Sequence, residues 1–151
     1  VGLGTADIMT LVELFMPHNS IFSWILFYYV IPMIFSFFVA FYTAKLINDP
    51  LVEISVICVV SLMSFKHLSY DYIALLPALA VAFRESEPLE KVTIISGVLY
   101  FWYGLKIMDL FNIFQKSSSH YFKYTIIFNF FVLGVILLAL FFSFRKTKNF
   151  G

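Results

Sequence analysis

Long apolar runs alternate with short polar stretches along most of the chain. The runs over 20–44, 92–114 and 124–144 each supply about the 20 residues that a helix needs to cross a bilayer. The runs over 51–64 and 72–83 are shorter, and a helix over the first of them reaches only roughly 21 Å against a hydrocarbon core of ~30 Å. The pattern predicts an all-α integral membrane helical bundle with four to five membrane segments, two of them short or broken.

Two local signals indicate where these helices bend or begin. Pro32 lies inside the run over 20–44, and a proline in a helix interior removes a backbone hydrogen bond, which predicts a kink. Asn48, Asp49 and Pro50 predict a turn in which Asp49 caps a helix that starts at Pro50.

The polar stretches between the runs give the orientation. Residues 84–91 and 115–123 are predicted as loops, and 1–19 as an interfacial segment or the end of a truncated span. If all five segments cross, one face receives most of the cations, namely Lys45, Arg84, Lys91, Arg145, Lys146 and Lys148. The positive-inside rule makes that face cytoplasmic. We therefore expect a cytoplasmic C-terminus, with the segment 64–71 and the loop 115–123 on the outer face. As the location we expect the plasma membrane of a prokaryote.

Composition supports a lipid environment and excludes several classes of partner. The chain is 62% hydrophobic and 13% charged, whereas soluble domains average about 45–50% apolar and about 25% charged residues. A net charge of +1 gives no support for a nucleic-acid partner. Cys58 is the one cysteine and the three histidines lack metal-ligand spacing, so we expect no disulfide, metal or cofactor. Because the chain begins at Val1, we expect a missing N-terminal portion or a partner chain.

The polar stretch between the two short runs carries the candidate chemistry. Lys66, His67 and Tyr70 can donate hydrogen bonds to phosphate or sugar oxygens, and Asp71 can accept them from hydroxyls. Ionisable groups at membrane depth cost about 2.5–3.5 kcal/mol each on insertion scales, so they usually face a cavity or a partner. The alternative is a turn whose side chains lie in lipid headgroups or water.

The same stretch resembles a pattern of glycosyltransferase family 87, the multi-spanning mannosyltransferase-like proteins. The resemblance rests on Ser64, His67, Tyr70-Asp71-Tyr72 and Leu75-Leu76-Pro77-Ala78. His18-Asn19-Ser20-Ile21 also resembles the asparagine-serine element of that family, and the likeness covers roughly residues 15 to 85. Phe65-Lys66 departs from the family, which more often has a proline directly before its histidine.

The resemblance implies transfer of a sugar, a hexose such as mannose, from a polyprenyl-phosphate-linked donor to an acceptor on the outer face. Lys66 and His67 would contact the donor phosphate, while Asp71 and Tyr70 would shape the sugar or acceptor pocket. Asn19 would belong to the second family element. The catalytic aspartate of the family lies in an earlier outer loop, and no acidic residue here matches it. The resemblance thus implies an incomplete hexosyltransferase, with the lipid bilayer and the lipid-linked donor as its partners.

A second pair of charges and an aromatic run lie further along the chain. Lys106 and Asp109 are three residues apart, so they share a helix face and can pair, as a structural clasp or inside the same cavity. Tyr100, Trp102 and Tyr103 fall in mid-span, where lipid contact or helix packing is the expected role.

Two functions of another class also fit the pattern. In a small membrane transporter, the short runs 51–64 and 72–83 would form a broken-helix solute site, with Lys106 and Asp109 as a gate or coupling pair. A structural membrane subunit without catalysis would need none of these groups.

Overall fold

The computed structural model describes residues 25–65, 69–84, 87–104 and 119–149, and the regular elements in these ranges are all helical. In chain order they are η1 (Leu26–Val30), α3 (Ile31–Leu46), α4 (Pro50–Ser64), η2 (Ser69–Leu75), α5 (Leu76–Arg84), α6 (Pro88–Leu99), η3 (Tyr100–Gly104) and α8 (Ser119–Asn149). The elements η1 and η3 are π-helical and η2 is a 3₁₀-helix. The prediction of an all-α chain is confirmed for the described residues.

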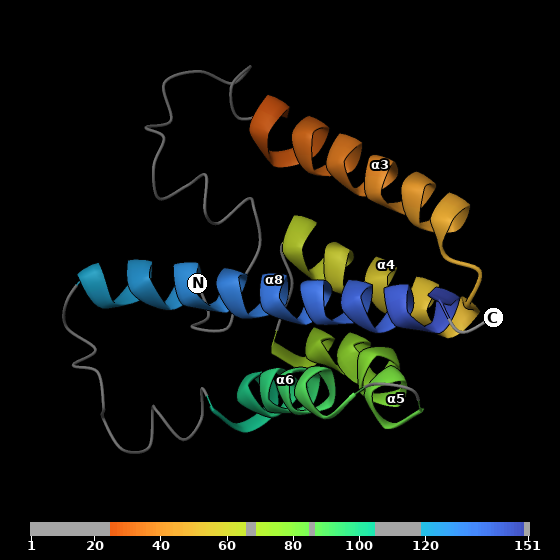
Figure 1. The fold of residues 1–151 in the computed structure, drawn as a ribbon. Helices are drawn as coiled ribbons and strands as arrows, with labels where there is room; N and C mark the ends of the chain where they lie inside the picture. Colours follow the sequence, from red (N-terminus) through yellow and green to blue (C-terminus); the bar gives the residue numbers. More distant parts are fainter. Residues whose placement is uncertain (1–24, 66–68, 85–86, 105–118, 150–151) are drawn as a thin grey trace.

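Successive α-helices run in opposite directions (Figure 1). The end of α3, the start of α4, the end of α5, the start of α6 and the end of α8 all lie at one end of the bundle, on the right of the view. We call this the basic end, because it holds the lysine and arginine side chains that the structure describes, Lys45, Arg84 and Lys91; the acidic Asp49, Glu53, Glu87 and Glu90 lie there as well. The opposite end carries the end of α4, η2, η3 and the start of α8, and we call it the polar-segment end.

A π-helical turn precedes the proline that was expected to kink the first apolar run. Pro32 has no N–H to donate, so the ordinary i→i−4 pattern cannot continue through it. Just before it, the backbone N–H of Ile31 donates to the carbonyl of Leu26, five residues back, which is the π-helical spacing. The irregular turn thus falls where the sequence predicts a kink, and helical structure continues on both sides of it.

The turn before α4 forms as the sequence predicts. Asp49 has extended backbone angles, and its Oδ1 accepts hydrogen bonds from the backbone N–H groups of Leu51 at 2.9 Å and Val52 at 3.4 Å. Pro50 occupies the first helical position, where a missing N–H costs nothing. The carboxylate of Asp49 also forms an ion pair with the guanidinium of Arg84 at the end of α5. One side chain therefore starts α4 and ties it to α5.

One run is broken, as the sequence predicts, and two predicted loops are partly helical, each for a local reason. The run 72–83 is divided into η2 and α5, because Pro77 in the first turn of α5 favours a new helix start. Half of the predicted loop over 84–91, residues 88–91, is the first turn of α6, which Pro88 starts at its first position. Of the predicted loop over 115–123, the last five residues belong to α8.

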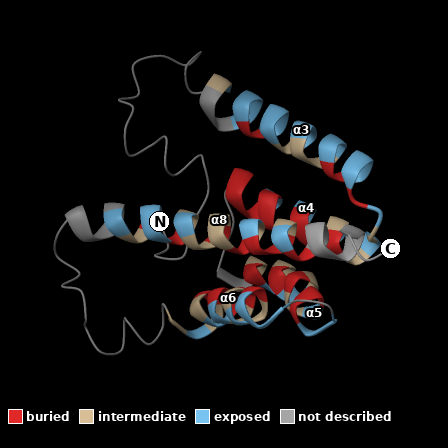
Figure 2. Cartoon of the chain, in the orientation of Figure 1, coloured by how far each residue is buried: buried red, intermediate tan, exposed pale blue. Residues whose placement is uncertain are grey.

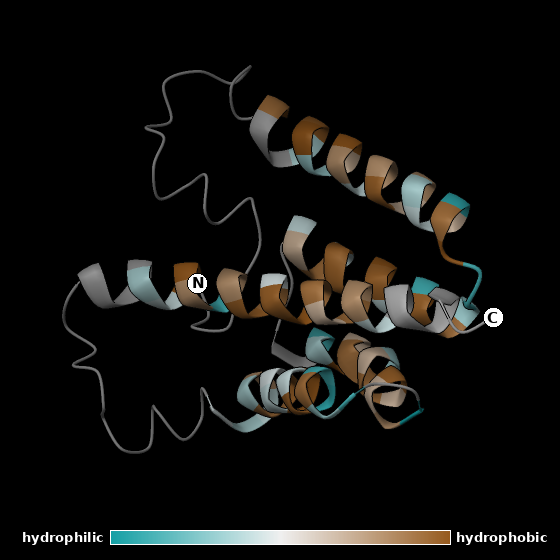
Figure 3. Ribbon diagram, viewed as in Figure 1, coloured by the Kyte–Doolittle hydropathy of each residue, from teal (hydrophilic) through white to brown (hydrophobic). Residues whose placement is uncertain are grey.

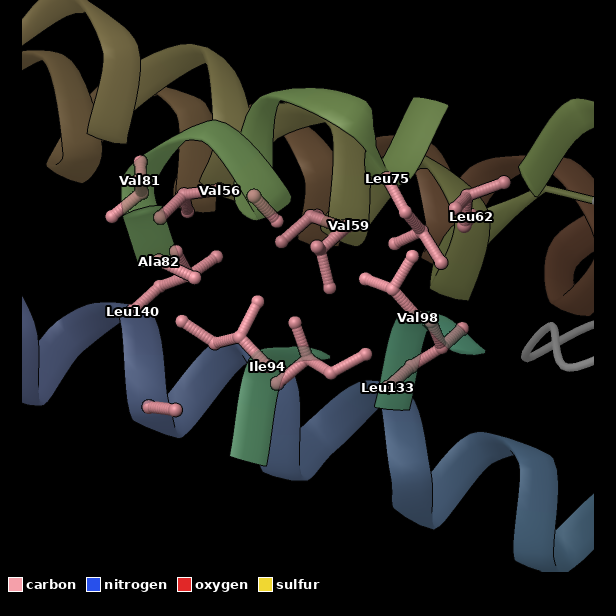
Figure 4. Packing of buried hydrophobic residues seen from close by; sticks show 14 of the residues in the cluster. Val56, Val59, Leu62, Leu75, Val81, Ala82, Ile94, Val98, Leu133 and Leu140 are labelled. Carbon is pink, nitrogen blue, oxygen red and sulfur yellow. The ribbon is translucent and has the colours of Figure 1, made fainter. Parts of the chain in front are cut away.

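The core lies between α4, η2, α5, α6 and α8. Figure 4 shows Val56, Val59 and Leu62 of α4 meeting side chains from the other four elements, and Figure 2 shows the buried residues concentrated on these helices rather than on α3. The α6–α8 contact is close at Gly97, where an added Cβ would lie 2.7 Å from the side chain of Ile136. Glycine at this position therefore allows the two helices to approach.

By length and composition, one helix in the described ranges is long and apolar enough to cross a membrane, the Tyr124–Ser143 part of α8. The apolar helices α3 and α4 are shorter, with 16 and 15 residues. The expected count of four to five spans is not supported, because one helix within the described residues meets this criterion. Figure 3 shows hydrophobic residues along α3, α4 and α8 and hydrophilic ones near the α3–α4 connection.

Replacing Asp49 tests its two roles. Asp49→Ala removes the cap and the ion pair and is expected to lower the free energy of unfolding by about 1–2 kcal/mol. Asp49→Asn keeps a good capping side chain and loses only a partly exposed ion pair, so its cost is expected to be a few tenths of a kcal/mol. Denaturant titration in detergent micelles measures both, with Asn48→Ala on the neighbouring exposed residue as control. Equal losses in Asp49→Ala and Asp49→Asn would contradict the capping role.

Candidate functional site

The two irregular helices of the polar-segment end meet each other. The indole Nε1–H of Trp102 in η3 donates a 3.2 Å hydrogen bond to the backbone carbonyl of Tyr72 in η2. The ring of Tyr72 stacks on Phe101, with centroids 4.4 Å apart and an interplanar angle of 26°. Tyr72 is 1% exposed, so the contact lies inside the bundle. These contacts fix the backbone of the segment that carries Asp71.

A buried polar pair joins η3 to α8 beside this contact. The Tyr100 hydroxyl donates a 2.7 Å hydrogen bond to Oδ1 of Asn129, which is fully buried. The Tyr100 ring also makes an edge contact with Phe128, at 5.4 Å between centroids. Tyr100 and Trp102 therefore have the packing role expected from the sequence. Tyr103 is 57% exposed, which fits the other expected role, lipid contact.

Glycine has a specific role in the π-helical turn. An added Cβ on Gly104 would lie 2.8 Å from the ring of Tyr100, so a larger residue would displace that ring. The turn therefore depends on a small residue four positions after the tyrosine. π-helical turns occur frequently at functional sites. The contact between the π-helical η3 and the 3₁₀-helical η2 therefore makes the polar-segment end the candidate functional site.

The structure describes only part of the predicted site. Asp71 lies in η2 with a half-buried side chain. Tyr70 also lies in η2, but its side chain is not among the described ones. The remaining predicted residues lie outside the described ranges: Asn19, Lys66, His67, Lys106 and Asp109. Their proposed contacts with a donor therefore stay predictions.

Ser64 is a polar residue of this end that the site prediction omitted. It is the last residue of α4 and is fully buried, yet its Oγ makes no hydrogen bond to any part of the chain that the structure describes. Other helical hydroxyls bond to the carbonyl four residues back: Thr43 to Val39 at 2.6 Å, Ser55 to Leu51 at 2.6 Å and Thr93 to Leu89 at 2.7 Å. The sequence alone carries no signal for this difference, because it depends on how the hydroxyl is turned.

The basic end carries charged and aromatic contacts of its own. Beside the Asp49–Arg84 pair, Nζ of Lys91 lies 5.1 Å from the centroid of the Phe83 ring, a distance typical of a cation–π contact. Glu90, in the first turn of α6, is 8% exposed. The Asp49–Arg84 and Phe83–Lys91 contacts connect α4, α5 and α6.

The described residues contain no group of three or more His, Cys, Asp or Glu side chains that could hold a metal ion. No family model, no curated protein and no solved structure matches this chain. The function is therefore argued from the geometry of the two ends.

The Tyr100–Asn129 hydrogen bond can be tested by a matched pair of substitutions. Tyr100→Phe removes the donor and leaves Oδ1 of a buried asparagine short of one hydrogen bond, so we expect the free energy of unfolding to fall by about 1 kcal/mol. Tyr103→Phe makes the same chemical change three residues on at an exposed position, and we expect no measurable effect. The two variants are compared by denaturant titration in the same detergent. A similar loss in both would show that the buried pair contributes little.

Proposed function

We propose that this chain is the multi-spanning membrane part of a glycosyltransferase that uses a polyprenyl-phosphate-linked sugar, with its donor site at the polar-segment end. The observation that carries the proposal is the separation of the two ends. The alternating helix directions collect the described cations Lys45, Arg84 and Lys91 at one end, together with the acidic Asp49, Glu53, Glu87 and Glu90, and place Asp71 with the irregular helices at the other end. Under the positive-inside rule, such a separation is expected of a membrane protein with a cytoplasmic basic end.

The exposed surface of α3 supports membrane embedding. The helix carries large exposed side chains around most of its circumference, and it packs mainly on α4. Those more than half exposed are Met33, Phe37, Phe38, Phe41, Tyr42 and Leu46. An isolated helix with so much apolar surface is stable in lipid and would aggregate in water.

The helix lengths are compatible with more than one crossing. Helical structure is continuous over 25–46 once the π-helical turn is included, which at about 1.5 Å per residue gives roughly 30 Å, the thickness of a hydrocarbon core. Residues 88–104 are likewise continuous through η3. We propose five membrane segments on this basis, with the shorter α4 covered by its neighbours and α5 packed against α4 and α6.

Irregular helix at membrane depth also supports a binding role. Such backbone is tolerated where it is buried in protein or lines a cavity, and broken helices often carry the substrate site of membrane proteins. In this chain η2 begins two residues after His67, and η3 ends two residues before Lys106. We propose that Lys66 and His67 bind the donor phosphate and that Asp71 accepts hydrogen bonds from the sugar or the acceptor.

A structural membrane subunit is the second candidate, and the same surface of α3 favours it. A helix with one main neighbour in its own chain has free faces that a partner protein could cover. This function requires no ligand at the polar-segment end, so ligand binding separates the two candidates.

Binding of a polyprenyl monophosphate to the purified chain in nanodiscs tests the donor site. We expect saturable binding, and we expect Lys66→Ala and His67→Ala each to weaken it about tenfold or more, because each removes a charge-assisted hydrogen bond to phosphate. His120→Ala and Lys45→Ala serve as matched controls with the same side chains removed elsewhere. Native mass spectrometry or microscale thermophoresis gives the dissociation constants. Absence of binding, or binding that all four variants retain, would favour the structural subunit.

A further inference from the structure

We draw no further inference here: the strongest candidate, the exposed apolar surface of α3 that carries Met33, Phe37 and Phe41, supports no proposal because nothing in the structure shows what covers it.

Discussion

The fold depends on the burial of α4 by its neighbours. This helix packs against α3, η2, α5 and α8, and half of its 15 residues are buried, many of them β-branched valines. Valine side chains lose little rotamer freedom on packing, and Val56 and Val59 lie fully buried at the centre of the core (Figure 4). A helix this apolar and this well covered must have neighbours on most sides, and the short connections on either side of it make antiparallel neighbours the simplest solution.

The position of α4 also determines how the two ends of the bundle differ. At its start, Asp49 caps the helix and pairs with Arg84, so that charge is concentrated where α3, α4 and α5 meet. At its other end the neighbouring elements are irregular, and the Trp102–Tyr72 hydrogen bond and the Tyr72–Phe101 ring stacking hold them together. Irregular backbone at membrane depth is tolerated where it is buried in protein or lines a cavity, and π-helical turns occur frequently at functional sites.

The sequence predicts the helical class and several helix starts, because these depend on local chemistry. Asp49 followed by Pro50 is a capping signal that acts within one turn, and it works as predicted. Pro88 carried a similar signal, but the charged residues around it suggested a loop instead. The Tyr100–Asn129 hydrogen bond joins residues 29 positions apart, and the conformation of η2 depends on its contact with η3. Such contacts arise only from tertiary packing, so hydropathy and spacing could not reveal them, and the roles of Lys66 and His67 stay predictions.

The central claim is that the helices alternate across a membrane, with the basic end inside. Labelling of single cysteines by a membrane-impermeant maleimide in sealed right-side-out vesicles tests it most directly, in a Cys58→Ala background that removes the one native thiol. The account predicts that Leu68→Cys and Ser117→Cys are labelled in intact vesicles, and that Asn48→Cys and Ser86→Cys are labelled only after the vesicles are opened. Labelling of positions 48 and 68 from the same side would contradict it, because α4 would then re-enter the membrane instead of crossing it.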